Sequence, residues 1–307
     1  MLIISAKSGQ LGNRLLLFAN FIAWAIEHKL TVINPAFEEY AEYFTGTAKD
    51  LLCCYPPPYF TAPGNKFIRS KYYKFIKYLS NKQVLKIQEI TREKPFSWSK
   101  YQARQQIKPG SNVCFQGWLF RDGWFVEDTP QLCKYADQIR AYLTPLPRYT
   151  THPDNLISNI KNSADTIVGI HIRQGDYAQH QNGRYFYTID QYIEVINAIA
   201  QLFSRNNIKF LICSNLQQEP SLFKSFNCVF GSGDLIEDIY ALSKCDYIVG
   251  PPSSYTMWAA FYEGKPLYMI RDVGKTIKIK DFVHFYEWQG MFNYRDNWSE
   301  SFWDWTQ

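Results

Sequence analysis

The sequence predicts an α/β protein whose carboxyl-terminal half contains a parallel, doubly wound sheet. The first observation is a run of β-branched apolar residues, Ile167, Val168, Ile170 and Ile172, which is typical of a buried central strand. The second is the alternation of short apolar segments with segments of helical period between residues 166 and 270. The third is that polar residues gather where these apolar segments end.

The expected elements alternate regularly along this half of the chain. Strands are predicted at 166–173, 208–214, 228–231, 246–250 and 266–270. Helices are predicted at 188–203, 234–244 and 254–263, and a weaker helix begins at Pro220. Because helices cover both faces of such a sheet, the loops that follow its strands share one edge.

Four consecutive loops at that edge are rich in Ser, Gly, Asp and Arg. They lie at 173–176, at 214–215, at 231–234 (Gly-Ser-Gly-Asp) and at 251–254 (Pro-Pro-Ser-Ser). Open α/β sheets bind ligands at the carboxyl ends of their strands. The pattern therefore favours a nucleotide-binding crevice over a structural coincidence.

The loop after the first strand of this half is the most informative of the four. Arg173 suits a phosphate because its planar guanidinium donates two hydrogen bonds at once. Gly175 allows the backbone to turn sharply or to approach a ligand closely. The alternative is a strand end closed by a structural ion pair between Arg173 and Asp176, and these residues alone leave both interpretations open.

A similar but weaker pattern opens the chain. A strand is expected at 2–5 and a helix at 11–30, with Gly9, Gly12, Asn13 and Arg14 at the turn between them. This geometry offers backbone N–H groups and a helix dipole to an anion. The turn matches neither of the usual glycine fingerprints for phosphates, and a plain turn is the alternative. Further strands are expected at 31–33 and 113–118.

A chain of 307 residues fits two domains of about 150 residues each. A proline-rich linker at 144–153 places their boundary, which gives domains 1–150 and 151–307. Residues 1–150 hold 20 basic and 11 acidic side chains, and residues 151–307 hold 13 and 17, so the net charges are +9 and −4. The aromatic tail at 281–307 is expected to pack back on the first domain, and an exposed patch for a partner is the alternative.

The first domain contains a basic segment in which no acidic residue occurs before Glu89. Its basic residues are Lys66, Arg69, Lys71, Lys74, Lys77, Lys82 and Lys86. Apolar residues are interleaved with them at helical spacing, which predicts a basic amphipathic helix that lies on an anionic membrane or binds an acidic polymer. A solvated basic face is the alternative.

The cysteine pattern and the apolar segments bear on the compartment. The seven cysteines follow neither a disulfide nor a zinc spacing, so reduced thiols are expected. No signal peptide and no membrane-spanning segment is recognisable. We therefore expect a cytoplasmic protein, with peripheral contact to the inner face of a membrane through residues 66–86 as a weaker expectation. No nucleic-acid partner is expected.

Two motifs carry a resemblance to a known family. The sequence H-x-R-x-G-D-Y, from His171 to Tyr177, resembles the first motif of the α-1,2-fucosyltransferases of glycosyltransferase family 11. That family usually has a second Arg where this chain has Gln174. The second motif runs from Asp238 through Asp246 to Ser253 and Ser254, and it is similar to an element shared by transferases that use GDP-fucose. The turn at 9–14 also resembles the first loop of fucosyltransferases, with Arg14 in place of their Gln.

The resemblance implies a fold and a set of binding roles. The fold would be GT-B-like, with two Rossmann-like lobes: an acceptor-side lobe at 1–150 and a lobe that binds the GDP-sugar at 151–307. Asp238 would accept hydrogen bonds from guanine, and Arg173 would bind the β-phosphate. Four more residues would line the nucleotide site, namely His171 beside the base or ribose, Asp234, Ser253 and Ser254. The residues that would face the sugar and acceptor are Gly9, Gly12 and Asn13.

The implied reaction is an inverting transfer of L-fucose from GDP-β-L-fucose to a hydroxyl of a glycan acceptor, α-1,2 to galactose. Arg173 and the helix that begins at Ser254 would stabilise the leaving pyrophosphate. The sequence has neither an acidic D-x-D pair nor a His/Cys ligand cluster, so no metal and no cofactor is expected. The candidates for the general base are Asp176 and His180, while Asp246 is expected to be structural.

Two other functions stay open at this point. Gln174 in place of a second Arg is compatible with a transferase that uses another nucleotide sugar. A protein that binds glycans or nucleotides without catalysis is also compatible with the aromatic tail and the basic segment.

Overall fold

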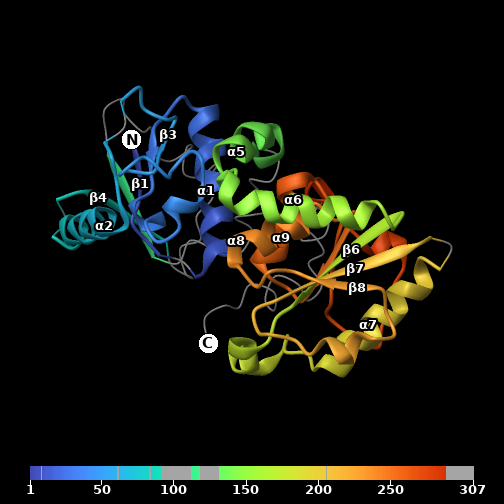
Figure 1. The fold of residues 1–307 in the computed structure, drawn as a ribbon. Coiled ribbons are helices and arrows are strands. Elements are labelled where there is room, and N and C mark those ends of the chain that lie inside the picture. The colour runs from blue at the N-terminus through green and yellow to red at the C-terminus, as the bar shows by residue number, and fades with distance from the viewer. Residues whose placement is uncertain are drawn as a thin grey trace. The chain divides into compact units, whose positions relative to one another are not determined.

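The computed structural model describes residues 1–7, 9–60, 62–82, 84–90, 112–117, 131–204 and 206–287. At 86–90, 116, 117 and 181 it describes the backbone alone. Within this part, the chain forms two compact units, Met1–Leu146 and Pro147–Glu287, and each is described here by itself (Figure 1).

The first unit is built on a five-stranded sheet. Its strands are β1 (Leu2–Ile4), β2 (Val32–Ile33), β3 (Cys54–Tyr55), β4 (Lys86–Ile90) and β5 (Val113–Gly117), in the order β3-β2-β1-β5-β4. All pairs are parallel except β2 with β3. The unit also contains α5 (Ala136–Tyr142) and two short 3₁₀ turns, Pro35–Phe37 and Ala41–Tyr43.

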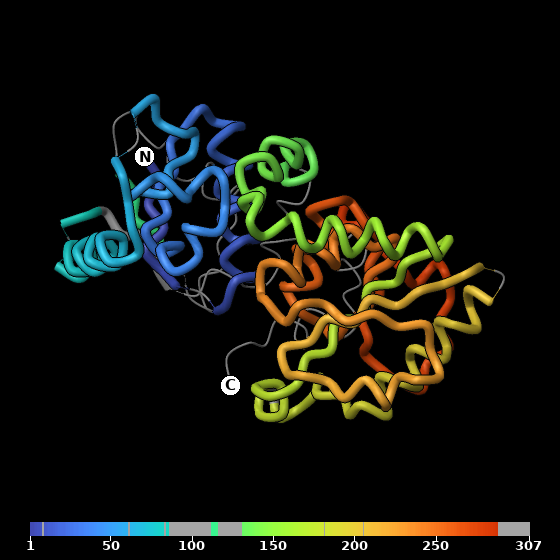
Figure 2. The backbone as a smooth tube through the Cα atoms, in the orientation of Figure 1, coloured from blue at the N-terminus to red at the C-terminus, as the bar shows by residue number. Residues whose placement is uncertain are grey.

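Two helices cover opposite faces of this sheet. Successive side chains of a strand point to opposite sides, so each helix packs against a different set of strand residues. On one face α1 (Leu11–Glu27) packs Phe21 edge-on against Phe115 of β5, with ring centroids 5.0 Å apart. On the other face Ile76 of α2 (Lys66–Asn81) joins Ile3 and Cys114 in a buried cluster. The two helices are seen on either side of the strands in Figure 1 and Figure 2.

The second unit is an alternating α/β structure around a fully parallel sheet. Its main elements are α6 (Pro147–Lys161), β6 (Thr166–Ile172), α7 (Ile189–Leu202), β7 (Ile208–Ser214), β8 (Cys228–Phe230), α8 (Leu235–Ser243), β9 (Tyr247–Gly250), α9 (Ser254–Glu263) and β10 (Leu267–Met269). The strand order is β10-β9-β6-β7-β8. The predicted α/β class and the doubly wound parallel sheet of the second half are confirmed.

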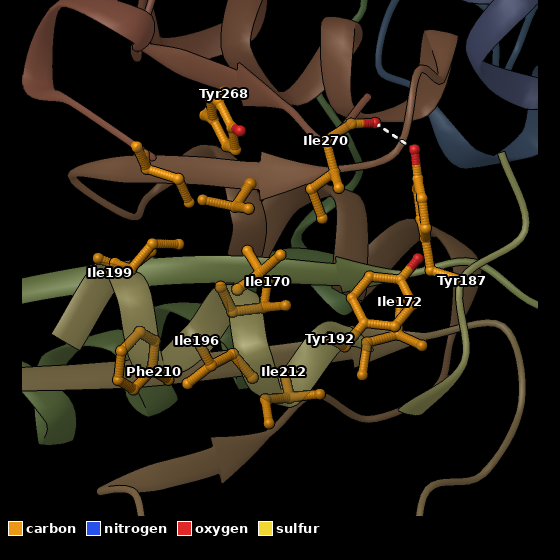
Figure 3. Packing of buried hydrophobic residues seen from close by; sticks show 14 of the residues in the cluster. Ile170, Ile172, Tyr187, Tyr192, Ile196, Ile199, Phe210, Ile212, Tyr268 and Ile270 are labelled. Atoms are coloured by element: carbon orange, nitrogen blue, oxygen red, sulfur yellow. Dashed lines mark hydrogen bonds between the residues drawn. The ribbon is translucent and has the colours of Figure 1, made fainter. Parts of the chain in front are cut away.

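The central strand β6 presents different residues to its two faces. Val168, Ile170 and Ile172 pack with Ile196 and Ile199 of α7 in the main hydrophobic cluster (Figure 3). Figure 3 also shows Tyr187 reaching Ile270, whose carbonyl oxygen accepts the Tyr187 hydroxyl at 2.8 Å.

The opposite face of β6 is shaped by Gly169. A Cβ at this position would come within 2.8 Å of Leu242 Cδ2 and 3.0 Å of Cys245 Sγ, so the glycine allows α8 to approach closely. His171, two residues further along the strand, lies on the same face as Gly169.

Three sequence-based assignments of secondary structure are wrong. The basic segment is not one helix, because α2 ends at Asn81 and Lys86 begins strand β4. The proline-rich stretch at 147–153 is not a linker, because it forms the first two turns of α6. Pro147 opens that helix, where a missing N–H is tolerated, and its carbonyl oxygen accepts the Thr151 hydroxyl at 2.8 Å. The predicted helix from Pro220 is only a 3₁₀ turn, Pro220–Phe223.

The beginning of the aromatic tail packs within the second unit. Phe282 contacts Tyr247 with ring centroids 5.1 Å apart, and Phe285 contacts Phe261 at the same distance. The rest of the tail, 288–307, lies outside the described residues, and so does Trp118 of the predicted strand at 113–118.

The cysteines and the helices bear on the expected compartment. All seven cysteines are free thiols, and five of them are buried. In the described part of the chain, no helix combines the length and the apolar character needed to cross a lipid bilayer.

Candidate functional site

The candidate site lies where the strand order of the second sheet reverses. β6 pairs with β7 on one side and with β9 on the other, with Val168 opposite Tyr247. Connections leave these neighbouring strands in opposite directions, which opens a crevice beyond their carboxyl ends. The loop that leaves β6 carries Arg173, and the loop that leaves β9 ends at Ser253, so the predicted edge is formed by adjacent strands.

A buried tyrosine joins the two loops. Tyr177, in the 3₁₀ turn Gly175–Ala178, donates a hydrogen bond to the carbonyl oxygen of Pro252 at 3.0 Å. Burial raises the pKa of its hydroxyl, which therefore stays a donor at neutral pH. The sequence motif contained Tyr177, but its side-chain partner is given only by the three-dimensional structure.

Arg173 is held at the start of the first loop by contacts on both its backbone and its side chain. Its backbone N–H donates to Tyr192 Oη at 3.0 Å, and its guanidinium Nη2 lies 2.7 Å from Asp176 Oδ2. Asp176 is the more exposed partner, with 51% of its side chain accessible against 16% for Arg173. The ion pair considered from the sequence is present, so Asp176 orients the guanidinium.

Gln174, which stands where the related family usually has a second Arg, is neutral and uses its side chain to connect two loops. Its side-chain Nε2 donates to the Tyr187 carbonyl oxygen at 3.3 Å, and its Oε1 accepts from Gln218 Nε2 at 3.3 Å. Its backbone N–H donates to Asn215 Oδ1 at 2.8 Å, which ties the loop after β6 to the loop after β7. Gln174 and Asn215 therefore fix loops and bring no charge to the edge.

His171 is a buried imidazole with an unsatisfied nitrogen. It is 4% exposed, and none of the described residues forms a hydrogen bond with its Nδ1. Its ring stacks on Tyr255 of α9, with centroids 4.8 Å apart and planes inclined by 30°. Burial, with a smaller contribution from Arg173, lowers its pKa to about 3, so the ring is neutral at pH 7. Tyr255 was not predicted, although it directly follows the Ser pair.

Asp238, in the first turn of α8, is a buried carboxylate that has no cationic partner among the described residues. Its Oδ1 accepts hydrogen bonds from the Gly233 N–H at 3.3 Å and from Ser232 Oγ at 3.5 Å. Burial raises its pKa to about 6. A Cβ at position 231 would lie 2.3 Å from this Oδ1, so a larger residue than Gly231 would clash with the carboxylate.

The two predicted residues next to helix starts serve as caps. Asp234 Oδ1 accepts from the N–H groups of Ile236 and Glu237 at the start of α8. At the start of α9, Ser253 Oγ accepts from the Tyr255 N–H at 3.2 Å. Ser253 is therefore the cap of α9, and Ser254 is its first helical residue.

The two base candidates lie on the loop after β6 but differ in their surroundings. Asp176 is engaged by Arg173, whereas His180 stacks on Tyr177 with ring centroids 5.3 Å apart. Burial lowers the pKa of His180, partly opposed by Asp176. His180 is therefore neutral at pH 7, which is the form of imidazole that accepts a proton.

The predicted glycine turn of the first unit follows β1, where the strand order of that sheet also reverses. Gly9 has a φ of +61°, and a Cβ there would lie 2.1 Å from Asn13 Nδ2, so any other residue would be strained at this position. Gly12 and Asn13 lie in the first turn of α1. Arg14 stabilises the turn, because its Nε donates a hydrogen bond to the Gly9 carbonyl oxygen. Its Nη1 also forms an ion pair with Glu39 at 2.7 Å.

Two further observations concern the expected structural role of Asp246 and the residue types that bind metals. Asp246 Oδ2 accepts the Ile167 N–H at 2.9 Å, so it joins β6 to the start of β9, a structural contact. Across the described residues, no group of three or more His, Cys, Asp or Glu side chains is arranged to hold a metal ion.

Sequence and structure comparisons show which known proteins this chain resembles. The family described as Glycosyl transferase family 11 matches residues 77–300. No curated protein matches the sequence. A GDP complex of a point mutant of FUT1 from Arabidopsis thaliana has a TM-score of 0.53 at 11% identity, covering 92% of this chain and 73% of that one.

The α-1,6-fucosyltransferase NodZ also has a similar structure. Its crystals with GDP and with GDP-fucose give TM-scores of 0.52 and 0.53 at 13% and 15% identity, and each comparison covers 88% of this chain and 94% of that one. At such identities the similarity shows a shared fold.

Proposed function

Because the chain belongs to glycosyl transferase family 11, we propose that it moves L-fucose from GDP-β-L-fucose to a hydroxyl of a glycan acceptor, α-1,2 to galactose, with inversion and without a metal. The observation that carries this proposal is the set of side chains at one sheet edge. Arg173 follows β6, the N-terminus of α9 follows β9, and Asp238 lies on α8 beside the same edge. NodZ and FUT1 crystals contain GDP or GDP-fucose, which supports a nucleotide-sugar donor.

Each end of the donor has a chemically matched group. The Asp238 carboxylate would accept the guanine N1–H and exocyclic N–H, because two parallel donors suit two carboxylate oxygens. The neutral His171 ring, stacked on Tyr255, would lie beside the base or ribose. Arg173 would bind the β-phosphate, and Ser254 with the first N–H groups of α9 would bind a phosphate oxygen.

The same residues suit the reaction. As the bond between the anomeric carbon and the β-phosphate oxygen breaks, negative charge grows on GDP, and Arg173 and the α9 N-terminus stabilise it. The acceptor oxygen forms the new bond from the opposite side, which converts a β-linked donor into an α-fucoside. Its proton passes to a base, and we assign that role to His180 because its imidazole is neutral. We assign acceptor recognition to the first unit, through Gly9, Gly12 and Asn13.

A transfer assay tests the reaction class. The protein is incubated with GDP-fucose and a galactose-terminated oligosaccharide in EDTA, and GDP release and product linkage are measured. We expect GDP release that depends on the acceptor and an α-1,2-linked product. Activity that appears only when a divalent metal is added would contradict the metal-independent mechanism.

One observation favours the alternative that the transferase uses a nucleotide sugar other than GDP-fucose. Gln174 is neutral, and its amide is bound to Tyr187 and Gln218, so the edge lacks the second cation that the family usually has there. A thermal-shift series with GDP, UDP, ADP and CMP separates the two donors. We expect stabilisation by GDP, and a preference for UDP would refute the guanine-binding role of Asp238.

A further inference from the structure

Helix α2 has two faces of different character. The buried residues Arg69, Tyr73, Ile76 and Ser80 recur at helical spacing, and Ile76 joins the core of the first sheet. The opposite face points to solvent and carries large apolar side chains. Phe67, Phe75 and Tyr78 are 66%, 55% and 57% exposed.

The exposed aromatic residues form one stripe together with a lysine. Positions 67, 71, 75 and 78 are separated by four, four and three residues, so they follow one another along one side of a helix. Lys71 Nζ lies 4.2 Å from the Phe67 ring centroid, which places the cation directly on this stripe. Three large aromatic side chains on one exposed helix face indicate a binding surface, whereas isolated exposed apolar residues are common.

Exposed lysines surround the stripe. Besides Lys71 they are Lys66, Lys74, Lys77 and Lys82. No ion pair with an acidic side chain neutralises them among the described residues, and the sequence contains no acidic residue from 51 to 88. The surface therefore combines uncompensated positive charge with apolar bulk.

The helix is fixed before any partner arrives. The sequence places Arg69 among the basic residues of the amphipathic face, but the structure shows that its side chain is buried and only 2% exposed. Its guanidinium donates to the carbonyl oxygens of Thr47 at 3.0 Å, Ala48 at 2.6 Å and Asp50 at 3.1 Å. Asn65 caps the helix by accepting the Ile68 N–H. The outer face is thus presented by a rigid helix that needs no ordering on binding.

We propose that the outer face of α2 docks the protein on an anionic phospholipid membrane. Lysines attract the negative headgroups, while Phe67, Phe75 and Tyr78 enter the boundary between headgroups and acyl chains. An acidic polymer would match the lysines alone and would leave the aromatic stripe in water. The lipid surface accounts for both properties, and the docking is independent of the proposed transferase reaction.

Vesicle sedimentation of the full-length protein tests the proposal. Vesicles of phosphatidylcholine are compared with vesicles of equal parts phosphatidylcholine and phosphatidylglycerol. We expect binding to the anionic vesicles only, and loss of binding at high salt, where charges are screened. Replacing Lys71 and Lys74 together with Gln should lower the partition coefficient about 25-fold, since each lysine contributes about fivefold near such a surface.

The variant Phe75→Lys separates the membrane from an acidic polymer. It adds one positive charge and removes one apolar anchor, so binding through charge alone should become about fivefold tighter. Insertion of the aromatic ring predicts the opposite, a partition coefficient lower by about tenfold. The matched control is Leu222→Ser combined with Lys224→Gln, which removes an exposed apolar and an exposed basic residue from the second unit and should change nothing.

Either of two results would overturn the proposal. One is equal recovery of the wild-type protein in the supernatant with both kinds of vesicle. The other is tighter binding of Phe75→Lys, which would point to an acidic polymer. Circular dichroism and GDP-induced stabilisation of each variant report whether fold and nucleotide site are intact, so loss of docking is distinguished from unfolding and from a wrong donor assignment.

Discussion

Replacing Asp238 with Asn should make the protein more stable at neutral pH while it strongly weakens GDP binding. Burial raises the pKa of the Asp238 carboxyl from an ordinary 3.8 to about 6. Each pH unit of such a difference corresponds to about 1.4 kcal/mol, so the ionised carboxylate costs the folded state about 3 kcal/mol as an upper estimate. Asn removes this cost and keeps a carbonyl oxygen that accepts from the Gly233 N–H.

The sign of the pH dependence follows from the raised pKa. Because the folded protein holds this proton more tightly than the unfolded chain, the destabilising contribution is absent below about pH 4. It develops as pH rises to about 6 and is complete above that. The variant should therefore match the wild type near pH 4 and exceed it above pH 6.

Urea unfolding of wild type and Asp238→Asn between pH 4 and pH 8 measures this difference, and calorimetry measures GDP affinity. We expect affinity for GDP to fall at least about a hundredfold, because Asn presents an N–H₂ to one guanine donor and leaves it unpaired. Wild-type affinity should also fall below pH 6, as the carboxylate becomes protonated. An early-melting variant that still binds GDP would show that Asp238 only supports the turn at 231–233.

Three further substitutions test separate parts of the site. Arg173→Lys keeps the positive charge but loses the planar guanidinium, so the turnover number should fall about a hundredfold or more, while affinity for GDP-fucose falls less and the melting temperature stays near that of the wild type. A lower melting temperature with a normal turnover number would mean that Arg173 forms only a structural ion pair. Gly231→Ala places a Cβ 2.3 Å from Asp238 Oδ1 and should weaken GDP binding, as measured by calorimetry, at least about tenfold. Tyr177→Phe removes the hydrogen bond to the Pro252 carbonyl oxygen and should lower the free energy of unfolding by about 1 kcal/mol. The turnover number should fall by a factor that corresponds to a larger free energy than this. An unchanged turnover number would show that this contact does not contribute to catalysis.

The order of elements in the second unit could be predicted because its signals are local. The apolar run at 166–172 and the alternation after it determine strands and helices that the structure reproduces within one or two residues, except for the weak helix at Pro220, which is a 3₁₀ turn. The helical start at Pro147 could not be predicted, because a proline-rich stretch is equally typical of linkers and of first helical turns. The end of α2 at Asn81 was missed because lysines continue past it at the same density.

The chemistry of the site was less accessible from the sequence than its location. Arg173, Asp238 and the Ser pair stood out because charged or polar residues follow apolar segments. That Ser253 caps α9 is decided by backbone geometry, which the letters S-S do not specify. The burial of Arg69 depends on carbonyl oxygens of residues 47, 48 and 50, which no side-chain pattern reports.

The reversal of strand order at β6 has a consequence for how the protein is made. Ile167 and Asp246, which bond β6 to the start of β9, are separated by 79 positions in the chain. At about 5–20 residues per second, a ribosome needs on the order of 4 to 16 s to synthesise that interval. Throughout this time one edge of β6 is open, and an unpaired apolar strand edge is a template for pairing with other chains. The loop that carries Arg173 is thus synthesised well before the loop that follows β9, and β6 presents an unpaired edge during that interval.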